Sequence, residues 1–124
     1  MKISLKLEKL VSSADYSKTL RHFNIQTNKK GLVLKAKTTN LSKARIGYNI
    51  PKKGTRHAHR RNRLKRIIKE YFRLNAFDLP KMDYVLILKQ ELSDDLLIET
   101  LANSFSEVGR TYSDKKKQSL RSSV

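Results

Sequence analysis

The chain has 124 residues, a length typical of a single domain, and its 28 Lys and Arg outnumber its 11 Asp and Glu. The resulting net charge of +17 disfavours the compact state through self-repulsion, and a polyanion is the kind of partner that relieves it. The absence of Cys excludes a disulfide framework, a thiolate zinc site and a cysteine nucleophile, and no apolar run approaches the roughly 20 residues that span a bilayer.

The N-terminal segment predicts a helix and an edge strand. The opening sequence MKISLKLEKLVSS alternates charged residues with Leu and lacks the apolar region of a secretory signal, so we expect a soluble, cytoplasmic protein. Ser12 and Asp15 resemble a helix-capping arrangement, which predicts a helix that begins near Ser12 or Ser13 and ends around His22. A short edge strand is expected at Asn24–Thr27.

Two alternating segments predict the next strands. After a turn at Lys29-Lys30-Gly31, the sequence LVLKAKTT alternates apolar residues with Lys, and RIGYNI alternates Ile and Tyr with polar or small residues. Pro51 ends the second of these strands because it has no N–H to donate to a neighbouring strand. The polar outer faces imply a sheet covered on one side, with the other side open to water or a ligand.

The clearest helix follows a basic loop. Its apolar stripe, at i, i+3, i+4, i+7 and i+8, consists of Leu64, Ile67, Ile68, Tyr71 and Phe72. The apolar run Tyr84–Leu88 is typical of a strand covered on both faces. The order strand, helix, strand therefore indicates a βαβ crossover with a parallel pair.

The last helix is expected to begin at Ser93, with Asp94 and Asp95 in the first turn, where the helix dipole favours acids. Its buried stripe consists of Leu97, Leu101, Phe105 and Val108. We therefore predict an α+β fold with a small mixed four-stranded sheet and about three helices, in a single domain over residues 1–113. The polar remainder, residues 114–124, has no periodicity and predicts a basic, disordered tail.

The charge is concentrated in one short segment. Residues 51–73 carry 10 basic and 1 acidic side chains, whereas residues 74–113 carry 3 basic and 7 acidic ones. Arg grips phosphate oxygens with paired hydrogen bonds, and Lys acts as a point charge. A solvated basic helix face is the alternative, but the basic residues continue into the preceding loop and only Glu70 intervenes. The segment predicts a phosphate-binding surface whose affinity falls steeply with salt.

The same segment resembles the bacterial ribonuclease P protein component. The hallmark of that family is an Arg-Asn-Arg helix motif that follows a Gly-containing strand and a Lys-Lys loop. In this chain these parts are Arg45-Ile46-Gly47, Lys52-Lys53 and Arg61-Asn62-Arg63, continued by Leu64-Lys65-Arg66. The resemblance is strongest over residues 45–73.

The resemblance implies a fold similar to one domain of ribosomal protein S5, with a left-handed βαβ crossover. It also implies a catalytic RNA as partner, in a holoenzyme that removes the 5′ leader of precursor tRNA by hydrolysis. The chemistry would belong to the RNA and to Mg²⁺ bound mainly by the RNA. The protein would bind with a stoichiometry of 1:1, without an organic cofactor and without catalytic or metal-binding side chains.

The resemblance also assigns two binding surfaces. The residues expected on the catalytic RNA or beside the leader are Lys52, Lys53, Arg56, Arg60, Arg61, Asn62, Arg63, Lys65, Arg66 and Lys69. A cleft between the first helix and the open sheet face would take the single-stranded leader, lined by Tyr16, Leu20, Lys35 and Arg45. Leu20 and Lys35 stand where the family often has aromatics, which leaves a more electrostatic platform. For Tyr16, a core or rim position is as compatible with the sequence as base stacking.

Two other classes of protein are compatible with the net charge and length of this chain. A ribosomal or rRNA-binding protein has no need of the Arg-Asn-Arg motif together with the Lys-Lys loop. A binder of anionic membranes needs a basic helix whose other face is free to enter lipid, whereas here that face is committed to a core. His57 and His59 do not share a helix face, and without Cys or an acid closer than Glu70 they predict loop residues near phosphate rather than a metal site.

Overall fold

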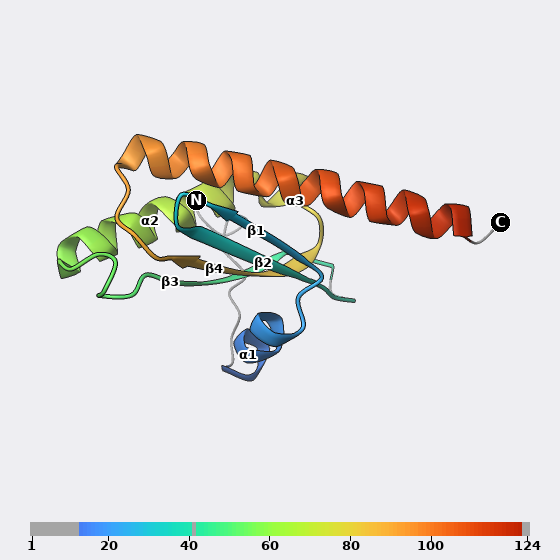
Figure 1. Cartoon of the computed structure of the whole chain (residues 1–124), viewed down its shortest axis with the longest axis horizontal. Helices are drawn as coiled ribbons and strands as arrows, with labels where there is room; N and C mark the ends of the chain where they lie inside the picture. Colours follow the sequence, from blue (N-terminus) through green and yellow to red (C-terminus); the bar gives the residue numbers. More distant parts are fainter. Residues whose placement is uncertain (1–12, 41, 123–124) are drawn as a thin grey trace, which may run out of the picture.

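A four-stranded sheet separates the helices into two layers in the computed structural model, which describes residues 13–40 and 42–122 (Figure 1). The strands, which lie in the order β1-β2-β4-β3, are β1 (Ile25–Lys29), β2 (Leu32–Thr38), β3 (Arg45–Asn49) and β4 (Met82–Leu88). The α-helices among the described residues are α1 (Ser13–Arg21), α2 (Ala58–Asn75) and α3 (Asp94–Ser122), and a 3₁₀ turn, η2 (Ala76–Asp78), follows α2. The predicted α+β fold with a mixed sheet is confirmed.

The strand pairing follows from the connections. Strands β1 and β2 are antiparallel and joined by a tight turn, in which Lys30 and Gly31 have positive φ angles of 50° and 80°. Glycine adopts this left-handed region without steric cost, which explains its place in the turn. Strand β4 pairs antiparallel with β2 and parallel with β3, so helix α2 forms the predicted βαβ crossover. The handedness of this crossover and the likeness to ribosomal protein S5 stay predictions.

The core lies between the sheet and the two later helices. Helices α2 and α3 cover one face, whereas α1 lies on the opposite face (Figure 1). The predicted stripe of α2 is confirmed, with Leu64, Ile68 and Phe72 at most 1% exposed and Ile67 and Tyr71 packed at its margin. The stripe of α3 is also confirmed, and it consists of the buried residues Leu97, Leu101, Phe105 and Val108.

The C-terminal segment differs from its prediction. Disorder was expected from residue 114, but helix α3 continues to Ser122, and residues 123 and 124 lie outside the described residues. The sequence DKKKQSLRS is rich in residues with good helix propensity, so it extends a helix that packing has already nucleated. Among the described residues, no helix combines the length and apolar character needed to cross a membrane.

The basic loop between β3 and α2 packs closely against the end of β4. A Cβ atom added at Gly54 would overlap the backbone carbonyl oxygen of Lys89. The N–H groups of Gly54 and Thr55 both donate to the carbonyl oxygen of Pro51, each at 3.2 Å. This close approach fixes the loop beside the end of β4, and α2 begins directly after the loop.

Replacing Gly54 by Ala is expected to lower the free energy of unfolding by about 1–3 kcal/mol, because the added methyl group meets backbone atoms rather than a flexible side chain. Gly109→Ala in α3 is the matched control. An added Cβ there has no atom within 4 Å, so the change is expected to stabilise the helix by about 0.5–1 kcal/mol. Urea denaturation measures both, and equal effects would contradict the packing of the loop.

Candidate nucleic-acid interface

The exposed side of α2 and the loop before it form one cationic surface. The buried stripe Leu64, Ile68 and Phe72 fixes the rotation of α2 about its axis, so the polar residues between those positions face outward. The exposed members of this surface, from loop and helix together, are Lys52, Lys53, Arg56, Asn62, Arg63, Arg66 and Lys69. Lys65 is half-buried on the same helix. Basic groups held at fixed spacing on a rigid helix suit a polyphosphate chain.

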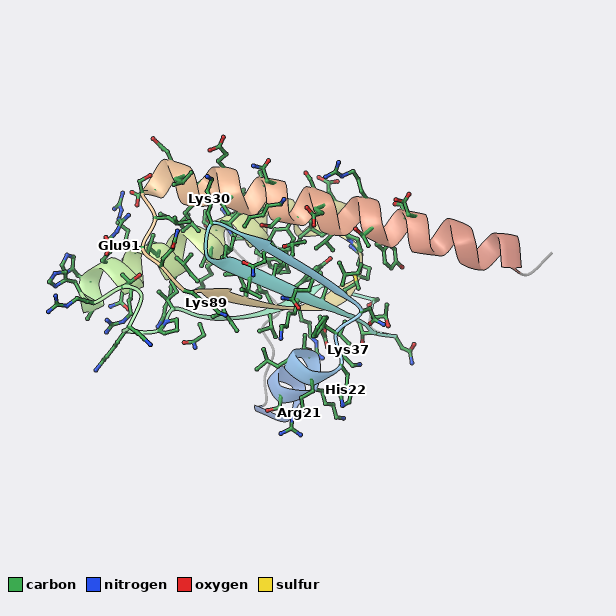
Figure 2. All side chains as sticks on the ribbon, in the orientation of Figure 1. Arg21, His22, Lys30, Lys37, Lys89 and Glu91 are labelled. Carbon is green, nitrogen blue, oxygen red and sulfur yellow. The ribbon has the colours of Figure 1, made fainter. Side chains whose placement is uncertain are left out.

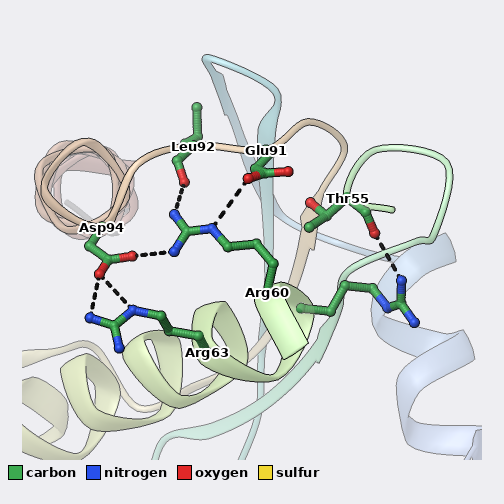
Figure 3. Close-up of polar contacts among 7 residues, drawn as sticks. Thr55, Arg60, Arg63, Glu91, Leu92 and Asp94 are labelled. Carbon is green, nitrogen blue, oxygen red and sulfur yellow. Dashed lines mark hydrogen bonds and ion pairs between the residues drawn. The ribbon is translucent and has the colours of Figure 1, made fainter. Parts of the chain in front are cut away.

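Arg60 belongs to the interior side of this surface rather than to its exposed face (Figure 3). Its side chain is 20% exposed, and its guanidinium donates to Asp94 Oδ1 and to the carbonyl oxygen of Leu92, both at 2.7 Å. A third contact of 3.3 Å joins its Nε to Glu91 Oε2. Arg60 therefore joins the first turn of α2 to the start of α3.

Arg63 and Arg61 also make contacts within the protein. Arg63 donates to Asp94 Oδ2 from Nε at 2.7 Å and from Nη2 at 2.6 Å, although 58% of its side chain is exposed (Figure 3). Arg61 donates from Nη1 to the carbonyl oxygens of Thr55 and Arg56, at 2.9 and 2.7 Å. The two arginines of the motif, which the sequence analysis assigned to RNA, thus both make contacts within the protein, although Arg63 also stays exposed.

Arg60 and Arg63 both pair with the carboxylate of Asp94. Hydrogen bonds from Arg63 and Arg60 lower the pKa of its carboxyl below the ordinary value of 3.8. The preceding residue, Ser93, accepts a hydrogen bond at its Oγ from the N–H of Leu96 at 3.3 Å, which is the expected helix cap. Asp94 therefore lies in the first turn of α3, as predicted, but its carboxylate also accepts hydrogen bonds from Arg60 and Arg63 of α2.

A second basic region lies on the other face of the sheet, beside α1. Lys35 Nζ donates to the carbonyl oxygen of Leu20 at 3.3 Å and lies 4.7 Å from the centre of the Phe23 ring. Figure 2 shows Arg21 and His22 at the end of α1, with Lys37 of β2 nearby. Aromatic and cationic groups together are the elements from which single-strand binding surfaces are built.

The four residues predicted to line a leader cleft have different surroundings. Leu20 is half-buried and Lys35 half-buried on this α1 side of the sheet, and Tyr16 lies in α1 with a side chain outside the described residues. Arg45 forms a bidentate ion pair with Asp83, with Nε–Oδ1 of 2.9 Å and Nη2–Oδ2 of 2.8 Å. This pair is largely buried between β3 and β4, so Arg45 contributes to the sheet itself.

Phe23 is a candidate residue that the sequence analysis missed. It is 37% exposed, next to Lys35, and it directly follows the basic pair Arg21-His22 at the end of the first helix. That adjacency of an aromatic to basic residues was the available signal. The internal roles of Asp94 and Glu91 carried no comparable signal, since they depend on where α3 meets α2.

His57 lies at the end of the loop, as predicted, whereas His59 lies in the first turn of α2, where a loop residue was expected. His57 and His59 are exposed, with ring centres 5.6 Å apart. In the described part of the chain, no group of three or more His, Asp or Glu side chains could hold a metal ion. The carboxylates near the cationic surface, Asp94, Glu91 and Glu70, pair with arginines instead.

Most of the chain matches the sequence model of one known protein family. The model described as Ribonuclease P matches residues 5–112, which include both basic regions. The chain belongs to the ribonuclease P protein family. The protein component of ribonuclease P from Chromohalobacter salexigens is 33% identical over 116 residues, covering 93% of this chain and 90% of that protein. The one from Edwardsiella ictaluri is 40% identical over 92 residues, covering 67% and 77%.

Solved structures of ribonuclease P proteins share the fold. The Staphylococcus aureus protein matches with a TM-score of 0.75 at 19% identity, covering 83% of this chain and 96% of that chain. The Thermotoga maritima protein matches with a TM-score of 0.65 at 26% identity, covering 77% and 93%. The sheet and helices that hold the cationic surface therefore form the fold of ribonuclease P proteins.

Membership in the ribonuclease P protein family gives the chain its function. It associates with the RNA subunit of ribonuclease P and takes part in removing the 5′ leader during tRNA processing. It is thus part of a ribonucleoprotein endoribonuclease.

The lowered pKa of Asp94 makes the stability of the protein pH-dependent in a defined direction. The ionised carboxylate stabilises the folded state above the ordinary pKa of 3.8, and this contribution is lost as the pH falls through the lowered pKa. We expect wild type to exceed Asp94→Asn in free energy of unfolding at neutral pH, with a difference that shrinks below about pH 4. Urea denaturation across this range measures it, and a difference independent of pH would contradict the ion-pair network.

Proposed function

We propose that the protein binds the catalytic RNA through the cationic surface of α2 and its preceding loop, as one copy per RNA in the cytoplasm, and the 5′ leader of precursor tRNA beside α1. The observation that carries the first assignment is the exposed row of loop and helix cations, held in place by a buried stripe. The second assignment is supported by the grouping of Phe23 and Lys35 on the opposite face.

The geometry of α2 favours RNA over a membrane as the partner of this surface. A helix that binds lipid inserts its apolar face among acyl chains. The apolar stripe of α2, which consists of Leu64, Ile68 and Phe72, is instead buried between the sheet and α3, and Leu74 in the last turn is the large apolar residue of α2 that lies exposed. The exposed face of α2 is predominantly cationic, and neutralisation of phosphates with release of counterions is the interaction that such a face supports.

The protein's contribution to catalysis is electrostatic and positional. Catalytic RNA and substrate are both polyanions, and the cations on α2 and its loop screen their repulsion, which lowers the Mg²⁺ concentration that the reaction requires. Mg²⁺, held mainly by the RNA, supplies the charge stabilisation of the hydrolytic step. Contacts with the leader add affinity that mature tRNA lacks, so substrate is favoured over product.

The direct experiment is cleavage of precursor tRNA by a bacterial ribonuclease P RNA at low Mg²⁺, with and without the protein. Strong stimulation with a product cut at the mature 5′ end is expected. Arg66→Ala on the exposed face of α2 is expected to reduce the slope of log K against log salt for RNA binding by about 1, because one phosphate contact is lost.

Arg110→Ala, which removes the same charge from an exposed position of α3, is the matched control and is expected to leave that slope nearly unchanged. Tight RNA binding without any stimulation of cleavage would demote the chain to a general RNA-binding protein. Equal effects of both substitutions would remove α2 from the interface.

Phe23→Ala is expected to reduce the preference for precursor tRNA over mature tRNA by about fivefold or more, because stacking of one base on an aromatic ring contributes about 1–3 kcal/mol. The measurement compares the affinities of the assembled holoenzyme for both tRNA forms. Phe77→Ala, at an exposed phenylalanine of η2, is the control and should preserve the ratio. Equal losses for precursor and mature tRNA would contradict a leader contact at Phe23.

A further inference from the structure

The first turn of α2 is electrostatically unfavourable on its own. It contains Arg60 and Arg61 and no acidic residue, and the N-cap residue His57 makes no side-chain capping bond. The N-terminal end of a helix has the positive end of the helix dipole and unpaired N–H groups, so cations there are destabilising. This turn needs negative charge from elsewhere.

That charge comes from Asp94 on another helix. Its Oδ1 accepts from Arg60 and its Oδ2 from Arg63, so one carboxylate bridges two arginines on the first two turns of α2 (Figure 3). Arg60 is further held by the carbonyl oxygen of Leu92 and by Glu91. Both of these lie in the segment that leads into α3.

We propose that Asp94 is a positioning residue of the RNA interface. Through Arg60 and Arg63 it fixes the start of α2 against the start of α3, so that the exposed cations of the loop and helix keep the spacing that RNA phosphates require. The inference rests on the proposed binding of the catalytic RNA by this surface.

Positioning by Asp94 and its negative charge alone predict opposite effects of its removal on RNA affinity. A carboxylate beside an RNA-binding surface repels phosphate, and Asp94→Asn raises the net charge by one, from +17 to +18. If Asp94 only diluted the positive field or competed with RNA for Arg63, its removal would tighten binding. If it positions the helix, its removal weakens binding in spite of the added charge.

Asp95 provides a matched control at the next position. It is exposed, lies in the same first turn of α3, and forms no ion pair with the residues that the structure describes. Asp95→Asn changes the net charge by the same amount at nearly the same place. The two substitutions therefore separate positioning from charge.

The experiment uses the full chain and a bacterial ribonuclease P RNA, with dissociation constants measured over a series of KCl concentrations. Asp94→Asn is expected to bind about tenfold more weakly than wild type, with a shallower salt slope because fewer phosphates are engaged together. Asp94→Glu should restore most of the affinity, and Asp95→Asn should bind as tightly as wild type or more tightly. Circular dichroism establishes that each variant is folded at the temperature of the binding measurement.

Arg60→Gln tests the same contact from the other side and decides the matter if Asp94→Asn does not fold. Arg60 is 20% exposed and faces α3, so its loss should weaken RNA binding more than Arg110→Gln, which removes the same charge from the surface of α3.

Two outcomes overturn the inference. One is Asp94→Asn binding as tightly as wild type or more tightly, with an undiminished salt slope. The other, for folded variants, is Arg60→Gln and Arg110→Gln having the same effect. In both cases wild type still binds with steep salt dependence, so the proposed function survives. Absence of salt-dependent RNA binding by wild type itself would instead reject the proposed function.

Discussion

Burial of one side of α2 is the constraint on which the rest of the molecule depends. Leu64, Ile68 and Phe72 are each at most 1% exposed, and exposing a side chain of this kind to water costs about 1.5–3 kcal/mol. Rotation of the helix would expose all three together. This cost exceeds the repulsion among surface cations at exposed sites, so the helix keeps its basic face outward and the loop before it beside the sheet.

Three acids of this cationic chain share one structural use, which is to join two elements. Asp94 joins α2 to α3, Asp83 joins β4 to β3 through Arg45, and Glu107 of α3 pairs with Lys29 of β1 at 2.8 Å. Each of these carboxylates pairs with a cation of a different element. These three acids thus stabilise junctions between elements, while most cations of the loop and of the outer face of α2 stay exposed. This division explains how a net charge of +17 is compatible with a defined fold.

The sheet gives the protein two distinct faces for a large RNA partner. Helices α2 and α3 cover one face, and α1 lies on the opposite face (Figure 1). Lys35 contacts Leu20 of α1 and the Phe23 ring, so this second basic group belongs to the α1 side, whereas the exposed cations of α2 belong to the other. One rigid sheet therefore holds two basic regions in a fixed relation. A rigid sheet with a binding region on each face suits a holoenzyme that must place a catalytic RNA and a single-stranded leader next to each other.

The sequence by itself determined the order and type of the main elements, the buried stripes, the concentration of charge in residues 51–73 and the family motif Arg61-Asn62-Arg63, but not the extent of α3 beyond residue 113. Periodicity, composition and local motifs are properties of neighbouring residues, which is why they can be read from the sequence. Only the tertiary structure decided which arginines pair with carboxylates of other elements. Arg60 and Arg63 meet Asp94 across more than 30 positions of sequence, and Arg45 meets Asp83 across 38. Such pairs depend on how α2, α3 and the strands pack together, and no local pattern encodes that packing.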